Sequence, residues 1–99
     1  MSLYKYLVLD AAFNGTGIRT DFTSSDVELD SLEISENLKR RITSWLADYH
    51  EQQFQGFENT ETAEGLDLEG VSIVKELRAE LPGVKISYYS EVCGSRLLV

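Results

Sequence analysis

The sequence has one cysteine and one proline among its 99 residues. A single cysteine excludes a disulfide within the chain and a metal cluster built on several cysteines. No apolar run approaches the length of a membrane span, and Met1–Leu9 lacks the basic segment and cleavage signature of a secretory signal peptide. We therefore expect a cytoplasmic protein that does not enter a membrane.

Basic residues are also scarce, at 9 against 17 acidic residues, for a formal net charge of -8. Between Asp21 and Glu69, thirteen acidic residues stand against only Lys39, Arg40 and Arg41, so this segment carries -10 and the rest of the chain +2. Such a field repels nucleic acid and speeds encounter with a basic partner. We expect no direct binding of nucleic acid. The acidic surface either attracts a basic partner or serves solubility alone.

Motifs of enzyme chemistry are missing as well. The sequence has no zinc-ligand spacing, calcium loop, dinucleotide fingerprint or Ser–His–Asp context, and the glycines of residues 14–17 lack the features of a phosphate-binding loop. His50 is the only histidine and is far in sequence from Cys93, the only cysteine. We therefore predict a protein that is not an enzyme, with no catalytic residue, no cofactor and no metal. A small hydrolase that uses His50 or Cys93 is an alternative.

The remaining composition, 42% hydrophobic, fits one domain over residues 1–99 with a single modest core. Apolar runs and alternating patterns predict four strands, the first two joined as a hairpin by the turn at Asn14–Gly17. These strands are Leu3–Ala12, Ile18–Phe22, Val84–Glu91 and Ser95–Val99. The polar segment Thr23–Glu33 predicts a loop, with a short strand at Val27–Leu29.

A first helix is predicted over about residues 35–53. Ser35 can cap its N-terminus, and apolar residues recur at helical spacing along it. The stripe consists of Leu38, Ile42, Trp45, Leu46 and Tyr49. We expect Trp45 to lie in the core, because it falls on this stripe.

A second helix is predicted over about residues 67–81, and three signals define it. Asp67 can act as N-cap, Leu66 and Val71 can form a hydrophobic staple, and Pro82-Gly83 cannot continue the helix. We expect Gly70 near its start to mark close packing against a neighbour. The preceding segment, Gln52–Gly65, is predicted to be irregular. Either its two phenylalanines pin it to the helices, or it is an under-packed connector.

The predicted fold class is α+β with two layers. A three- to five-stranded, mainly antiparallel sheet carries the two helices (about 35–53 and 67–81) on one face. The strand order does not follow from the sequence. An exposed edge strand at Ile18–Phe22 or Arg96–Val99 could pair with a second copy, so we expect a monomer or a weak homodimer.

Two stretches carry a family resemblance: ITSWLADYH at residues 42–50 and LDLEGVSIVKELRAELPGVKISYYSE at residues 66–91. With the acidic connector between them, they resemble the small immunity proteins of bacterial contact-dependent growth inhibition and related polymorphic-toxin systems. The resemblance covers about residues 38–91. It implies a cytoplasmic protein that binds the C-terminal domain of one cognate toxin and blocks its active site or substrate groove. Many such toxins are nucleases with basic clefts.

If the resemblance holds, the acidic segment is the candidate binding face, with charges that steer encounter and Phe57 as an apolar anchor. An adaptor that binds another basic cellular protein is the alternative. The candidate partner-binding residues are Asp21, Asp26, Glu28, Asp30, Glu33, Phe57, Glu58, Glu61 and Glu64.

Overall fold

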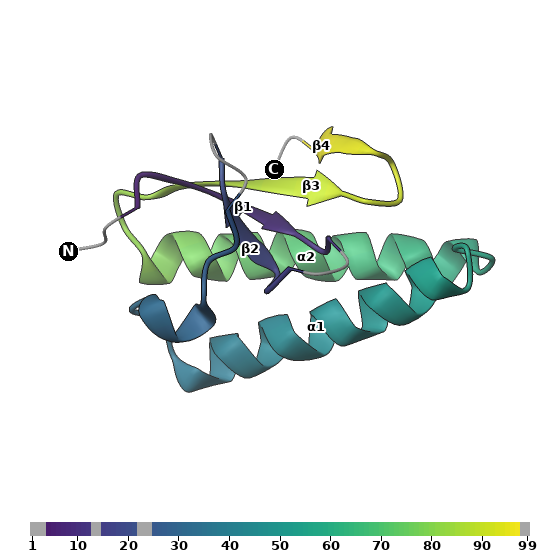
Figure 1. Cartoon of the computed structure of the whole chain (residues 1–99), viewed down its shortest axis with the longest axis horizontal. Helices are drawn as coiled ribbons and strands as arrows, with labels where there is room; N and C mark the ends of the chain where they lie inside the picture. The colour runs from purple at the N-terminus through teal and green to yellow at the C-terminus, as the bar shows by residue number, and fades with distance from the viewer. Residues whose placement is uncertain (1–3, 13–14, 22–24, 98–99) are drawn as a thin grey trace.

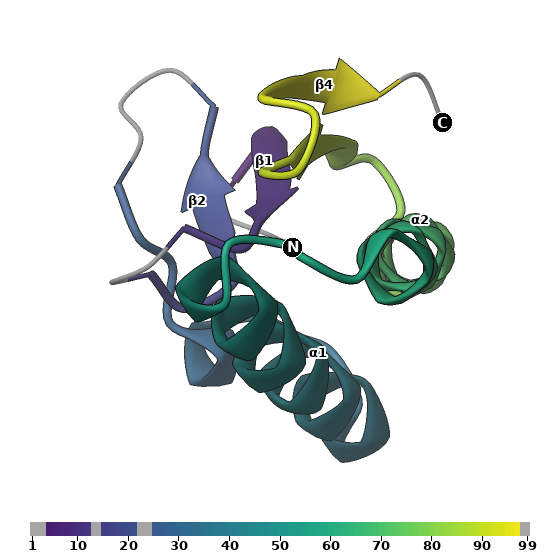
Figure 2. The ribbon, with the colours of Figure 1, turned by 90° about the vertical axis from the view of Figure 1, so that its right-hand side faces the viewer.

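The computed structural model describes residues 4–12, 15–21 and 25–97. Four strands form one sheet, and two long helices cover one of its faces (Figures 1 and 2). The predicted two-layer α+β architecture is therefore confirmed. The predicted strand residues Leu3, Phe22, Leu98 and Val99, and Asn14 of the predicted turn, lie outside the described residues.

The sheet has the strand order β2-β1-β3-β4. Its strands are β1 (Tyr6–Asp10), β2 (Ile18–Thr20), β3 (Lys85–Ser90) and β4 (Ser95–Leu97). Pairing is antiparallel in β1–β2 and β3–β4 and parallel in β1–β3, so the sheet is mixed, and the predicted hairpin of the first two strands is present. A parallel pair needs a long crossover, and the two helices supply it.

Helix α1 runs over Glu36–Phe54, close to its predicted bounds. The Ser35 hydroxyl accepts a hydrogen bond from the Leu38 N–H at 3.2 Å, which confirms the predicted cap. The predicted stripe faces the core. Trp45 is buried, and its indole N–H donates to the Leu66 carbonyl at 2.9 Å, so its polar edge is satisfied and its core role is confirmed.

Helix α2 spans Thr60–Glu80, seven residues longer at its start than predicted. The prediction that Asp67 caps this helix, with Leu66 and Val71 as a staple, is wrong. The cap is Asn59, whose side-chain oxygen accepts from the Thr62 N–H at 3.0 Å. Apolar packing explains the difference, because Ala63 and Leu66 are buried and extend the stripe toward the N-terminus. Most of the segment predicted to be irregular is therefore helix.

The connector between β2 and α1 also differs from its prediction. In place of a strand at Val27–Leu29, one isolated bridge joins Arg19 and Asp26, and a 3-10 helix, η1, covers Leu29–Ser31. Val27 and Leu32 are buried and hold the connector on the core. Within the described part of the chain, no helix is long and apolar enough to cross a membrane.

Candidate partner-binding surface

The structure places the nine candidate residues in two separate groups. Five follow β2 and continue to the start of α1: Asp21, Asp26, Glu28, Asp30 and Glu33. Four lie in the α1–α2 turn and the first turns of α2: Phe57, Glu58, Glu61 and Glu64. Figure 1 shows the α1–α2 turn at one end of the 41 Å long axis and η1 toward the other. The nine residues do not form one face.

Two of the five charges of the first group are neutralised within the protein. Asp21 forms an ion pair with Arg96, and this guanidinium holds the pKa of the Asp21 carboxyl below its usual range. Asp30 pairs with Lys39 at 3.2 Å, and Lys39 also pairs with Glu36 at 3.1 Å. A partner's cation would have to compete with these basic residues.

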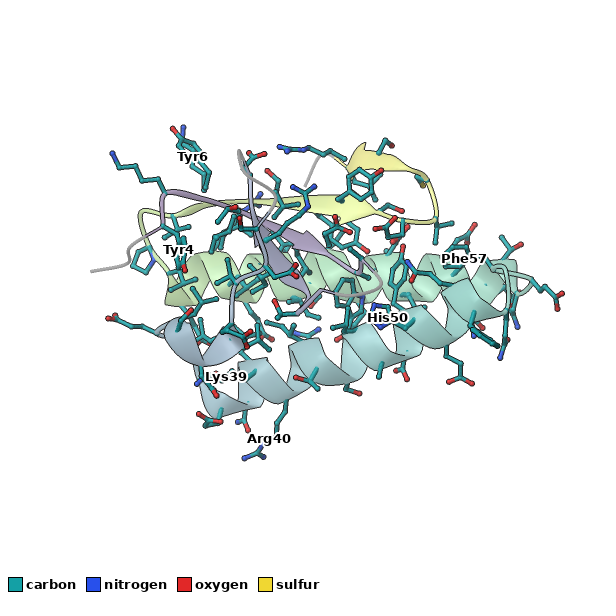
Figure 3. All side chains as sticks on the ribbon, in the orientation of Figure 1. Tyr4, Tyr6, Lys39, Arg40, His50 and Phe57 are labelled. Atoms are coloured by element: carbon teal, nitrogen blue, oxygen red, sulfur yellow. The ribbon has the colours of Figure 1, made fainter. Side chains whose placement is uncertain are left out.

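A groove of about 700 Å³ runs between this connector and α1, with both signs of charge around it. Glu28 and Asp30 line one side, Lys39 and Arg40 line the other, and Leu46 contributes apolar surface. Figure 3 shows Lys39 and Arg40 on this part of α1, far from Phe57. The mixture of charges makes this groove a weaker match to a basic partner than its acidic residues alone suggest.

The second group differs in its electrostatics. Glu58, Glu61 and Glu64 are exposed, and none of them has an ion-pair partner among the residues that the structure describes. Phe57, with a left-handed φ of 55°, is half-buried and packs edge-on against Tyr49 with 5.8 Å between ring centroids. Phe57 therefore pins the turn to the core, which bears out for one of the two phenylalanines the interpretation that both of them pin this segment.

Two exposed apolar side chains near this turn were not among the predicted binding residues. Phe54, at the end of α1, is 87% exposed, so it does not pin the turn. Leu68 on α2 is 73% exposed and lines a shallow groove with Val71 and Leu97. Leu68 could have been noticed, because it falls off the helical stripe that Leu66 and Ile73 share. We call Phe54, Glu58, Glu61, Glu64 and Leu68 the helix-turn surface.

A polar network centred on Asp67 holds the elements beneath this surface together. The Asp67 carboxylate accepts hydrogen bonds from the hydroxyls of Tyr49 at 2.9 Å, Tyr88 at 2.6 Å and Ser90 at 2.7 Å. Tyr49 in turn accepts from the Val92 N–H at 3.1 Å. Burial raises the pKa of Tyr49 to about 12. The network joins α1, α2 and the β3–β4 turn, so it fixes the positions of the elements that carry the helix-turn surface.

His50 and Cys93, the two residues considered for catalysis, lie on different elements of the fold. His50 Nε2 lies 3.0 Å from the Ala12 carbonyl oxygen and so ties α1 to the segment after β1. Cys93 is exposed in the β3–β4 turn. The described residues include no group of three or more His, Cys, Asp or Glu side chains arranged to hold a metal ion.

Comparison with protein families decides the broad identity. A family model described as Serratia CdiI immunity protein-like matches residues 9–91. The chain belongs to this family. The resemblance found in the sequence is thereby confirmed, and the match spans both acidic groups, so it does not choose between them. None of the curated proteins compared with the chain matches it.

Proposed function

We propose that this immunity protein binds and neutralises one cognate toxin domain through the helix-turn surface, and that the toxin is a basic nuclease. One observation carries the choice of surface. Three exposed carboxylates without ion pairs in the described structure lie at the same end as two strongly exposed apolar side chains. Apolar anchors surrounded by charges that match the partner are the pattern of high-affinity protein interfaces.

The carboxylates set rate and specificity in this proposal. Charges already neutralised within a protein add little to the field that a partner meets, so Glu58, Glu61 and Glu64 count for more than Asp21 or Asp30. A nuclease binds phosphates in a basic cleft. Carboxylates brought to such a cleft occupy the positions of those phosphates and keep the nucleic acid out.

The apolar side chains supply affinity. Burying a phenylalanine or leucine side chain that is otherwise exposed contributes roughly 1.5–3 kcal/mol. Phe54 and Leu68 have most of this surface still to bury. Phe54 ends α1 and Leu68 lies in the first half of α2, and the turn between these packed helices is held by Phe57, so little order is lost when the toxin binds. In this account the protein acts in the cytoplasm by occupying its partner, without chemistry of its own.

The test is a titration with the toxin C-terminal domain encoded immediately upstream of this gene, at low and at high salt. We expect tight binding that weakens as salt rises. Reversing three charges together, Glu58→Lys, Glu61→Lys and Glu64→Lys, should slow association by about tenfold or more at low salt. The matched control reverses Asp26, Glu28 and Glu33 to Lys, which changes the net charge equally at the other end and should slow association less.

A second pair of variants tests the anchors. Phe54→Ala and Leu68→Ala should each speed dissociation and weaken binding by about tenfold, with little effect on the salt dependence. If neither salt nor any of the five substitutions changes the affinity for the toxin domain, the interface lies elsewhere. Absence of binding by the folded protein would favour the adaptor for another basic protein.

A further inference from the structure

A shallow groove lies between helix α2 and β4, the strand at one edge of the sheet. We call it the α2–β4 groove. Leu97 of β4 lies opposite Tyr88 in the sheet register, so its side chain is on the face that the helices cover. Figure 2 shows β4 and α2 on the same side of the molecule, away from β2. The groove has a volume of about 310 Å³ and is lined by Glu64, Asp67, Leu68, Val71 and Leu97.

The floor of the groove is apolar, with a carboxylate at one end. Glu64, Leu68 and Val71 are spaced four and three residues apart, so their side chains follow one another along one face of α2. Val71 and Leu97 are half-buried and pack against the core, which fixes their positions. Leu68 is 73% exposed. The groove therefore offers apolar surface that is still uncovered.

The Asp67 carboxylate is hydrogen-bonded but has no counter-charge in the described structure. It accepts from three neutral hydroxyls, and among the described residues no lysine or arginine forms an ion pair with Asp67 or Glu64. Within the same residues its Oδ2 accepts from Ser90 alone, at 2.7 Å, so a lone pair remains for another donor. Two negative charges thus stand uncompensated beside the apolar floor.

The basic residues that flank these elements in the chain do not line the groove. Lys75 follows Val71 by a further turn of α2. Arg96 precedes Leu97, but it lies on the opposite face of the sheet and pairs with Asp21. A purely apolar side chain in the groove would cover the carboxylates without a counter-ion, which is costly. The occupant that fits must bring its own positive charge.

We propose that the α2–β4 groove receives one arginine side chain of the toxin. Its alkyl stem lies on Leu68, Val71 and Leu97, and its guanidinium contacts the carboxylates of Glu64 and Asp67. Arginine fits better than lysine, because its planar group presents five donors and can reach two carboxylates one helical turn apart. This inference rests on the proposed function and deepens it, since Glu64 and Leu68 belong to the helix-turn surface.

The larger groove beside α1 lacks this combination of groups. Lys39 and Arg40 line it and repel a cation, and Asp30 is already paired with Lys39 at 3.2 Å. The α2–β4 groove has no basic residue among its lining. Figure 1 also shows β4 toward the same end of the molecule as the α1–α2 turn, so one partner can cover both. Charge and position together favour the α2–β4 groove.

The first experiment is footprinting of the upstream toxin domain with phenylglyoxal, which modifies accessible arginines, read by mass spectrometry with and without this protein. Val71→Phe fills the groove with a larger side chain. We expect one toxin arginine to be protected by the unaltered protein and to regain its reactivity with Val71→Phe, while the affinity falls by about tenfold. Urea denaturation checks that the variant is folded.

A double-mutant cycle then pairs that arginine with Glu64. Methionine in place of the toxin arginine keeps an apolar stem and removes the charge. This change and Glu64→Gln should each weaken binding by about three- to tenfold, and together by little more than either alone, because both remove one contact. Glu61→Gln is the matched control: Glu61 is exposed one turn earlier and does not line the groove, so its effect should add to that of the toxin substitution.

The outcomes are distinct. Toxin binding without an arginine that couples to Glu64 overturns the arginine site while leaving the helix-turn surface in place, and so does coupling of Glu64 to a toxin lysine instead. If Val71→Phe fails to fold, the cycle at the exposed Glu64 decides alone. Absence of toxin binding by the folded protein overturns both proposals together.

Discussion

Gly70 lies directly against the ring of Tyr88. A Cβ atom on residue 70 would clash with Tyr88 Cε1 and stand 2.7 Å from the Tyr88 hydroxyl oxygen. That hydroxyl donates to Asp67, one turn earlier on the same helix. Helix α2 is therefore seated on β3 by a glycine that admits the ring and a carboxylate that holds its tip, and the close packing expected at Gly70 is confirmed.

The first prediction concerns this contact. Gly70→Ala should lower the free energy of unfolding by about 1–3 kcal/mol, because the ring must move to admit the methyl group. The measurement is urea denaturation. Gly65→Ala on the same helix is the matched control: its Cβ meets nothing within 4 Å, so the alanine should stabilise the helix by up to about 1 kcal/mol. Equal stabilities for the two variants would contradict the contact.

The second prediction concerns Asp67. Asp67→Ala leaves three hydroxyl donors without their shared acceptor and should lower the free energy of unfolding by at least about 2 kcal/mol. The exposed Glu61, replaced by Ala in the same helix, should change it by less than about 0.5 kcal/mol. Denaturation of both variants in urea is the check. A small effect at Asp67 would mean that water replaces it in the network.

The third prediction concerns alkaline pH. The pKa of Tyr49 is raised to about 12 from an ordinary value of 10.0, and burial raises that of Tyr88 further. A raised pKa means that the stabilising contribution is present below pH 10 and is lost as pH rises toward 12. Stability should therefore fall across this window. Tyr49→Phe should show a shallower fall, and an equally steep one would assign the loss to other groups.

The fourth prediction concerns Glu91 in the free protein. Its pKa is raised from 4.5 to about 7, so its contribution to stability is full below about pH 4.5 and is lost as pH rises through 7. Glu91→Gln cannot ionise, so it escapes this loss. The variant and the unaltered protein should be equally stable at pH 4.5, with the variant more stable at pH 8. A pH-independent difference in urea midpoint would contradict the raised pKa of Glu91.

Local patterns in the sequence predicted both helices and all four strands, since each depends on neighbours within a few residues. Helix α1 agrees with its prediction because Ser35 and the apolar stripe give the same bounds. The predicted start of α2 was seven residues too late, because Asp67 satisfies the local rules for an N-cap. Its partners, Tyr49, Tyr88 and Ser90, are distant in sequence, so no local rule reveals that its carboxylate serves them.

The local patterns of the sequence did not predict how distant segments of the chain come together. The parallel pairing of β1 with β3 depends on how the helices cross over, and it places Asp10 beside Tyr89. The acidic residues were correctly noticed as unusual. Their division into two groups at opposite ends depends on the tertiary fold, as does the pairing of Asp21 with Arg96. Which group binds the partner stays a prediction.

Hydrogen exchange on the toxin-bound protein tests the central claim most directly, because it locates the interface without a substitution. The account predicts slower exchange in the complex over residues 52–68 and 91–97, and unchanged exchange over η1 and the first half of α1. Protection confined to residues 25–40, with the α1–α2 turn unaltered, would contradict it.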